Sequence, residues 1–306
     1  MRSPFSGLVV PMITPFDGLG RPAADRAIRF GTDLLNNGVN GLALFGTTSE
    51  GQSLSASERM DLLDAMIAGG IESARLMPGT GACALSDAIV MTRHAVERQC
   101  GGVLLLPPFF YKAINDDGIF RFVAELIEKV ASPDLRIYLY HIPPVAQVGF
   151  SVELVCQLHE HFPEQIVGLK NSSGSHDYTV ALRENCPDLD VFCGSEDFLL
   201  ATIRAGGMGC ISATGNANPR GILKLYENVD TDNAENLQKS ASAIRAIFQA
   251  RPMIPSLKAT ISLFYADPQW LNVRPPLLPL PKGDAEKLLS DLADRDFDPS
   301  SILSIS

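Results

Sequence analysis

The stretch Ile166-Val167-Gly168-Leu169-Lys170-Asn171-Ser172-Ser173-Gly174 joins a short apolar run to a lysine and a polar turn that ends in glycine. The apolar part is typical of a strand buried on both faces. Lys170 then stands at the carboxyl end of that strand, where the chain leaves the sheet. Burial disfavours the ammonium form and lowers the pKa of a lysine, and a neutral lysine can form a Schiff base with a carbonyl compound. The alternative is a structural lysine whose side chain reaches past the strand end to solvent.

Short apolar segments alternate with amphipathic segments on both sides of this stretch. The alternation recurs eight times, which predicts parallel strands joined by right-handed crossovers. Eight units favour an α/β fold of the closed (β/α)8 TIM barrel type over the alternative, an open doubly wound sheet. The predicted strands are 7–14, 41–45, 75–80, 102–106, 135–140, 166–170, 190–194 and 209–212, and the predicted helices are 23–37, 55–71, 85–99, 116–130, 151–161, 176–185, 197–205 and 219–228.

The last part of the chain shows helical spacing over 233–250, 254–264 and 285–293 and no further strand–helix unit. We therefore expect a catalytic barrel over residues 1–229 and a C-terminal helical extension over residues 230–306 that packs on it. The proline-rich run from Arg274 to Pro281 could be a ligand for an SH3-type domain. We interpret it as a packed connection, because its leucines favour burial.

Composition excludes several classes of protein. The chain has 306 residues, of which 46% are hydrophobic and 20% charged, and its net charge is −10. The acidic balance argues against a nucleic-acid or anionic-membrane partner. No segment is long enough to span a membrane and the start lacks the apolar run of a signal peptide, so we expect a cytoplasmic protein. Six cysteines without a C-x-x-C pair are expected to be reduced core thiols: Cys83, Cys100, Cys156, Cys186, Cys193 and Cys210.

Polar groups follow several of the predicted strands. In a TIM barrel the active site lies at the carboxyl ends of the strands, so these groups are expected to converge with Lys170. The phenol of Tyr140 can pass protons, and the hydroxyls of Thr47 and Thr48 suit a carboxylate. Gly46 would let the backbone of that turn approach a ligand. Each feature alone also has a structural interpretation, a plain strand-to-helix turn or a core tyrosine; their common position at one end of the barrel favours a site.

Three motifs carry a resemblance to a known family. They are Gly46-Thr47-Thr48-Ser49-Glu50-Gly51, Tyr140-His141-Ile142-Pro143 and Val167-Gly168-Leu169-Lys170. In order and spacing the chain resembles the dihydrodipicolinate synthase / N-acetylneuraminate lyase family of class I, Schiff-base aldolases, over nearly its whole length. The resemblance implies a barrel that assembles as a homotetramer or homodimer. It also implies action on pyruvate or a related 2-oxo acid without a metal or an organic cofactor.

The resemblance also implies roles for individual residues. Lys170 would form the imine, Tyr140 would shuttle protons, and Thr47 would join the hydroxyl relay beside it. Thr48, with the backbone around it, would hold the carboxylate of the oxo acid. The rest of the substrate would be read by Gly194, Glu196, Asp197, Ile211 and Ser212.

The chain departs from the family pattern at three places. Ser49 replaces the usual glycine before the glutamate, and Phe110 stands where many synthases lend a tyrosine to a neighbouring subunit, so Tyr111 is a possible substitute in the relay. Val145 stands where members that make dihydrodipicolinate carry an arginine for the aldehyde's carboxylate, and an apolar side chain cannot replace a bidentate guanidinium. We therefore expect an aldolase, lyase or dehydratase for a sugar-acid-like or other 2-oxo acid, with the second substrate unassigned.

Several alternatives remain open at this stage. They are 4-hydroxy-tetrahydrodipicolinate synthase proper, N-acetylneuraminate lyase proper, a non-catalytic barrel that binds a 2-oxo acid as a sensor, and a metal-dependent aldolase. The run Gly79-Thr80-Gly81-Ala82-Cys83-Ala84 matches a dinucleotide-binding pattern. The next strand lacks the acidic residue that such a site requires, so we set this interpretation aside.

Overall fold

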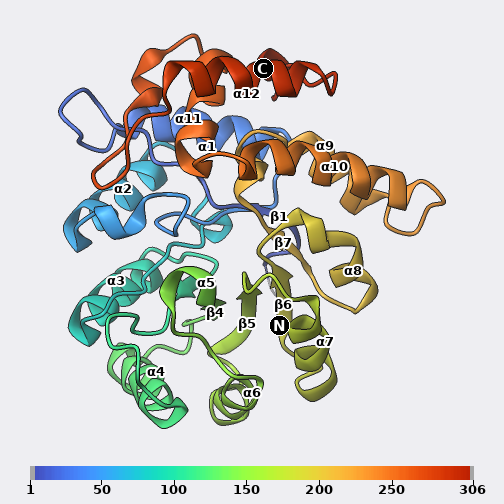
Figure 1. Cartoon of the computed structure of the whole chain (residues 1–306). Helices are drawn as coiled ribbons and strands as arrows, with labels where there is room; N and C mark the ends of the chain where they lie inside the picture. Colours follow the sequence, from blue (N-terminus) through green and yellow to red (C-terminus); the bar gives the residue numbers. More distant parts are fainter. Residues whose placement is uncertain (1–3, 304–306) are drawn as a thin grey trace.

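The computed structural model describes residues 4–303. Within them, seven parallel strands form one sheet in the order β2-β1-β7-β6-β5-β4-β3, with helices around its outside (Figure 1). This arrangement is a TIM-barrel-like α/β fold. The strands are β1 Gly7–Val10, β2 Gly41–Leu42, β3 Val103–Leu105, β4 Ile137–His141, β5 Ile166–Asn171, β6 Asp190–Cys193 and β7 Gly209–Ile211.

The predicted strand at 75–80 differs from the structure. A 3₁₀ turn, η2 Ser73–Arg75, is followed by extended chain that makes only isolated parallel bridges, Leu42↔Leu76 and Gly79↔Leu104. Pro78 has no N–H to donate, which interrupts a regular ladder. The segment nevertheless lies between β2 and β3, since Met77 N donates to Leu42 O at 2.9 Å and Thr80 N donates to Leu104 O at 3.1 Å.

The helices begin close to where the sequence predicts them. The capping box at Ser55 is confirmed: Glu58 N donates to Ser55 Oγ at 3.2 Å and Ser55 N donates to Glu58 Oε2 at 2.9 Å. A short helix, α5, was not predicted. The helices are α1 Ala24–Asn36, α2 Ala56–Ala68, α3 Leu85–Glu97, α4 Asp116–Val130, α5 Pro143–Ala146, α6 Val152–His161, α7 His176–Asn185, α8 Leu199–Arg204, α9 Pro219–Glu227, α10 Ala234–Gln249, α11 Met253–Phe264 and α12 Lys282–Ala293.

The inner face of the sheet is filled by large side chains, and this packing explains the glycine of the Lys170 strand. Gly168 pairs with Tyr138 across β5 and β4. A Cβ on Gly168 would lie 2.5 Å from the Tyr138 ring, so only glycine fits there. Tyr140 follows Tyr138 on the same face of β4 and pairs with Lys170. The register of these two strands therefore brings the phenol and the amine side by side.

The helices after α9 lie along one side of the strands, in orange and red at the top of Figure 1. Helix α10 contacts α9 and also η3 (Glu196–Phe198), the 3₁₀ turn that follows β6. The end of α10 thus reaches the carboxyl ends of the strands. No helix among residues 4–303 has the length and apolarity needed to cross a membrane.

The prediction of six reduced core thiols is wrong for part of the set. Cys156 on α6 and Cys186 directly after α7 form a disulfide, with their Cα atoms 5.8 Å apart. Helices α6 and α7 are neighbours, and the two cysteines, thirty positions apart in the sequence, meet only because these helices pack together. Cys83 is exposed and Cys100 is half-buried, whereas Cys193 and Cys210 are buried free thiols, as predicted.

Candidate active site

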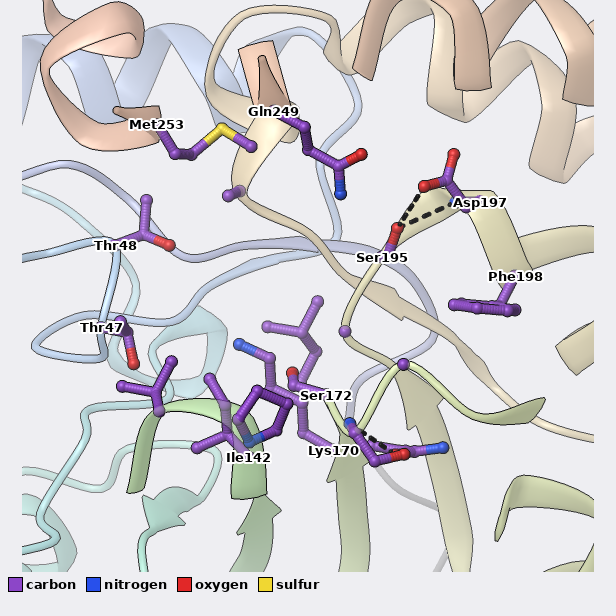
Figure 2. A pocket seen from close by; sticks show the side chains of 18 of the residues that line it. Thr47, Thr48, Ile142, Lys170, Ser172, Ser195, Asp197, Phe198, Gln249 and Met253 are labelled. Atoms are coloured by element: carbon purple, nitrogen blue, oxygen red, sulfur yellow. Dashed lines mark hydrogen bonds between the residues drawn. The ribbon is translucent and has the colours of Figure 1, made fainter. Parts of the chain in front are cut away.

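A cavity of about 560 Å³ opens at the carboxyl ends of the strands (Figure 2). It is the place at which the predicted groups were expected to converge. Its walls come from the turn after β2, the ends of β4 to β7, and α10 with the chain that follows it. The lining residues are Thr47, Thr48, Tyr140, Ile142, Pro144, Val145, Lys170, Asn171, Ser172, Ser173, Gly174, Gly194, Ser195, Asp197, Phe198, Ile211, Ala213, Arg245, Gln249, Arg251 and Met253.

Lys170 is the penultimate residue of β5 and is only 4% exposed. The prediction of a buried lysine at the carboxyl end of a strand is therefore confirmed. Its Nζ lies 4.2 Å from the centroid of the Tyr140 ring, which follows from the pairing of the two residues across β4 and β5. The flat ring of Tyr140 screens one side of the amine from water, and the cavity lies in front of it.

The hydroxyls of Tyr140 and Thr47 lie next to each other at the cavity. The Tyr140 OH lies 3.3 Å from Thr47 Oγ1, although the two residues are 93 positions apart in the chain. Either hydroxyl can donate in this pair, as a relay that moves protons in both directions requires. Lys170, Tyr140 and Thr47 thus meet at one wall of the cavity, as the sequence predicts.

The turn from Gly46 to Gly51 presents Thr47 and Thr48 to the cavity, and Thr48 is 8% exposed. Gly46 itself is not among the lining residues; its carbonyl accepts from Gly51 N at 3.0 Å and closes the turn. The part of the turn that lines the cavity is therefore the two threonines that directly follow Gly46.

The loop after β6 divides into lining and buried residues. Gly194, Asp197 and, from β7, Ile211 line the cavity as predicted. Glu196 and Ser212 do not line it, which differs from the prediction. Both are fully buried.

Glu196 turns away from the cavity because a cation from α10 holds it. It accepts hydrogen bonds from Ser212 and Thr214 and from Arg245 Nη1 at 2.9 Å. A buried carboxylate needs such partners. Arg245 also lies 3.3 Å from Asp197 Oδ2 through its Nε. Arg245 therefore balances two adjacent carboxylates and fixes the loop that carries Asp197.

Tyr111, the possible relay residue, lies outside the lining of the cavity. It is 72% exposed and its ring meets Phe110, itself 70% exposed, edge to face at 5.3 Å. Within the described part of a single chain, the hydroxyl of Tyr140 has a hydrogen-bond partner in Thr47 and none in Tyr111.

Among the lining residues that sequence reasoning missed, four come from the region assigned to an appended extension, namely Arg245, Gln249, Arg251 and Met253. Arg245 and Gln249 belong to α10, Met253 begins α11, and Arg251 lies in the connection between them. The four-residue spacing of Arg245 and Gln249 places them on one helix face, but nothing in the sequence shows which way that face points. Figure 2 shows Gln249 and Met253 above the cavity, opposite Lys170.

His141 follows Tyr140 and is held as a neutral ring. Phe150 N donates to its Nδ1 at 3.0 Å, and the ring stacks on Tyr178 at 4.1 Å. Burial lowers the pKa of His141 from 6.5 to about 4. Between these values the unfolded chain binds a proton that the folded chain does not, so the free energy of unfolding falls as pH falls.

We expect His141 to make the protein less stable by about 3 kcal/mol as pH drops from 6.5 to 4, since one pKa unit corresponds to about 1.4 kcal/mol. Urea unfolding at several pH values, for the wild type and for His141→Gln, measures this contribution as the difference between the two slopes. The assignment to His141 fails if both proteins lose stability equally over this range.

Comparison with known proteins agrees with this geometry. Residues 4–294 match the Dihydrodipicolinate synthetase family. An uncharacterized DapA-like lyase of Chloroflexus aurantiacus is 30% identical over 92% of this chain and 94% of its own length. The 4-hydroxy-tetrahydrodipicolinate synthase of Thermus thermophilus is 32% identical over 95% of this chain and 96% of its own.

Solved structures show the same fold. Dihydrodipicolinate synthase from Agrobacterium tumefaciens aligns with a TM-score of 0.88 at 30% identity, over 95% of this chain and 99% of that one. YagE, a prophage protein of the dihydrodipicolinic acid synthase family from E. coli K12 solved in complex with pyruvate, aligns with a TM-score of 0.88 at 24% identity, over 96% and 99% of the two chains. The chain therefore belongs to the dihydrodipicolinate synthetase family and is a lyase of the Schiff-base aldolase class.

Proposed function

We propose that the protein makes or breaks a carbon–carbon bond beside the carbonyl of pyruvate or a related 2-oxo acid, through an imine on Lys170. The observation that carries this proposal is the meeting of a buried amine with the Tyr140–Thr47 hydroxyl pair at one cavity wall. A relative that binds pyruvate in its solved structure supports the choice of oxo acid.

The proposed chemistry begins when the Lys170 amine attacks C2 of pyruvate. The carbonyl oxygen takes two protons and leaves as water while the amine nitrogen loses two, giving the imine, and Tyr140 lies beside the amine to pass these protons. Loss of a proton from C3 and gain of one by the imine nitrogen give the enamine. In the synthetic direction C3 then bonds to the carbon of an aldehyde, whose oxygen takes a proton, and water releases Lys170. Cleavage is the reverse sequence.

The carboxylate of the oxo acid is assigned to Thr48, whose hydroxyl lies at the same cavity on the strand-end turn. Hydroxyl and backbone donors recognise a carboxylate without a metal ion. In this proposal Lys170, Tyr140, Thr47 and Thr48 act on the oxo acid, and Gly194, Asp197 and Ile211 read the rest of the substrate.

For the second substrate we propose a neutral, hydroxylated aldehyde of the kind released from a sugar acid. Ser195 Oγ donates to Asp197 Oδ2 at 3.1 Å, and Asp197 and Gln249 both lie at the cavity (Figure 2). Carboxylate and amide oxygens accept hydrogen bonds from hydroxyl groups. On the opposite side Pro144 and Val145 line the cavity, so that wall offers no cation to a second carboxylate.

A second candidate is 4-hydroxy-tetrahydrodipicolinate synthase, the activity that names several relatives. One observation favours it, the presence of the Arg251 guanidinium among the lining residues. That guanidinium already has partners, since its Nη1 donates to Ile247 O at 2.9 Å and its Nη2 pairs with Asp291. We therefore rank this activity below action on a hydroxylated aldehyde.

The proposal is tested with pyruvate and two groups of aldehydes, hydroxylated ones such as glyceraldehyde and carboxylated ones such as aspartate semialdehyde. Pyruvate consumption and product mass are followed for each pair. We expect faster turnover with hydroxylated aldehydes. Faster turnover with carboxylated aldehydes would favour the synthase, and imine formation without any turnover would favour a 2-oxo acid sensor.

Asp197→Asn is expected to raise the KM for a hydroxylated aldehyde at least about tenfold, since a hydrogen bond to a charged group is worth about 1.5–3 kcal/mol. The KM for pyruvate should not change, because Lys170 and Thr48 bind that substrate. Steady-state kinetics with each substrate varied in turn measures both constants. Asp188→Asn, at an exposed aspartate before β6, is the control. An unchanged aldehyde KM would remove Asp197 from the site.

We further propose that residues 76–80 serve as the eighth strand position, and that residues 1–229 and 230–306 form the barrel and its appended helical extension. The bridges from Leu76 and Gly79 to both neighbouring strands support the first of these. We also propose that the protein is a cytoplasmic homotetramer or homodimer. The acidic charge of −10 supports the further proposal that it has no nucleic-acid or membrane partner.

A further inference from the structure

The turn that carries Thr47 and Thr48 is strained at both ends. Phe45 has φ 57° and Glu50 has φ 55°, and neither is glycine. Such conformations cost on the order of 1–3 kcal/mol each and persist only where the surroundings enforce them. The turn is also folded tightly on itself: a Cβ on Gly51 would lie 1.9 Å from Phe45 O. Something outside the turn must therefore hold it in this form.

A buried ion pair ties Glu50 to α11. The Nζ of Lys258 lies 2.5 Å from Glu50 Oε1, and both side chains are completely buried. Lys258 also donates to Asn272 O at 2.6 Å and lies 4.3 Å above the Phe16 ring. The second oxygen of Glu50 accepts from Arg274 N at 2.8 Å. The carboxylate is thus fixed from two sides by residues more than 200 positions away.

Arg274 secures the chain that follows the turn. Its guanidinium pairs with Glu58 through both terminal nitrogens, and it donates to Ser53 O at 2.8 Å and to Gly20 O at 2.7 Å. Glu58 is the residue of the α2 capping box. The segment from Glu50 to Glu58 is therefore held by one face of the C-terminal region, while the threonines on its other side face the cavity.

Stability alone does not account for the buried pair. Removing two charges from water costs several kcal/mol per ion, and apolar side chains of similar volume often serve a fold equally well. The pair also fixes the position of the turn, because Glu50 belongs to it. Thr47 in the same turn lies 3.3 Å from the Tyr140 hydroxyl. None of Glu50, Lys258 and Arg274 lines the cavity.

We propose that Lys258 is a positioning residue for the Schiff-base reaction: through Glu50 it holds the strained Thr47–Thr48 turn and thereby the contact between Thr47 and Tyr140. The inference rests on the proposed function, in which these hydroxyls move protons between imine and enamine. It assigns a catalytic consequence to helix α11, which does not provide a reacting group.

The test measures the proton step without the second substrate. Pyruvate that forms an imine exchanges its methyl hydrogens for deuterium from solvent through the enamine, and ¹H NMR follows the loss of signal. Reduction with cyanoborohydride measures imine formation on Lys170 separately. The work is done at pH 7, because burial lowers the pKa of Lys258 to about 8 and the pair must be charged.

The variant Glu50→Gln/Lys258→Met removes both charges while keeping similar volumes, so it leaves no unpaired buried ion. We expect imine trapping at saturating pyruvate to stay within about twofold of the wild type and deuterium exchange to fall at least tenfold. Tyr265→Phe is the matched control: it removes the bond from the end of α11 to Asp33 Oδ2 at 2.5 Å, which does not involve the turn. It should exchange like the wild type.

Three outcomes overturn the positioning role. The first is deuterium exchange in the double variant equal to that of the wild type. The second is a loss of imine trapping in the double variant as large as its loss of exchange. The third is a loss of exchange in Tyr265→Phe as large as that in the double variant. If circular dichroism shows that the double variant does not fold, folded Glu50→Gln alone must show reduced exchange for the role to stand. A wild type that exchanges no hydrogens would instead contradict the proposed function itself.

Discussion

Lys170→Met is expected to lose all measurable turnover, a decrease of at least about 10⁴-fold, because no other amine lies among the described residues that line the cavity. Methionine matches the length of the lysine stem but cannot bond to a carbonyl carbon. Pyruvate consumption with a saturating aldehyde measures the loss. The variant should keep its fold, since it replaces a polar side chain that is only 4% exposed by an apolar one of similar length.

The control is Lys282→Met at a surface lysine whose side chain is 91% exposed. It should turn over at the wild-type rate. Residual activity in Lys170→Met within about a hundredfold of the wild type would show that another group carries the chemistry and would contradict the assignment.

Tyr140→Phe is expected to lower kcat by about 10²–10⁴-fold, the usual contribution of a positioned proton donor or acceptor. The variant keeps the ring that lies 4.2 Å from Lys170 Nζ and loses only the hydroxyl that contacts Thr47 at 3.3 Å. Imine formation should therefore continue, more slowly, while hydrogen exchange at C3 of pyruvate should fall in proportion to kcat.

The control for this variant is Tyr178→Phe, which removes a phenol that donates to Phe150 O at 2.8 Å outside the cavity. It is expected to have little effect on kcat. If Tyr140→Phe keeps the wild-type exchange rate, the phenol does not carry the proton and the hydroxyl relay begins elsewhere.

The sequence predicts the wall of the cavity that carries Lys170, Tyr140 and Thr47, because each of its parts is a local feature. Lys170 ends an apolar strand, Tyr140 ends another, and Thr47 follows a third. The carboxyl ends of parallel strands meet at one side of the fold, so residues at those ends converge whatever the details of packing. Strand order and the pairing of Tyr140 with Lys170 then follow from the crossover rule and the close approach at Gly168.

The opposite wall could not be predicted in the same way. Whether Glu196 faces the cavity or the interior depends on Arg245, which comes from a helix 49 positions later. Helical spacing shows that α10 has two faces, but the direction of each is set by tertiary packing. The same limit applies to the disulfide between Cys156 and Cys186, and to the contact of Lys258 with Glu50.

At one predicted strand, the local backbone prevents the regular pairing that the apolar pattern predicts. Residues 75–80 are apolar enough to be a strand, yet Pro78 has no backbone N–H to donate. Gly79 also packs tightly against Phe45, because a Cβ on Gly79 would lie only 2.7 Å from Phe45 O. The result is extended chain with isolated bridges in place of a regular ladder. A single proline inside a short apolar run was the signal that could have shown this.

The central claim is that Lys170 forms an imine with a 2-oxo acid. Its most direct test is to incubate the protein with pyruvate and borohydride, and to determine the intact and peptide masses beside Lys170→Met treated in the same way. We predict one reduced pyruvate adduct on the peptide that contains Lys170 and none in the variant. The absence of an adduct with pyruvate and with longer 2-oxo acids, or an adduct that persists in the variant, would contradict the account.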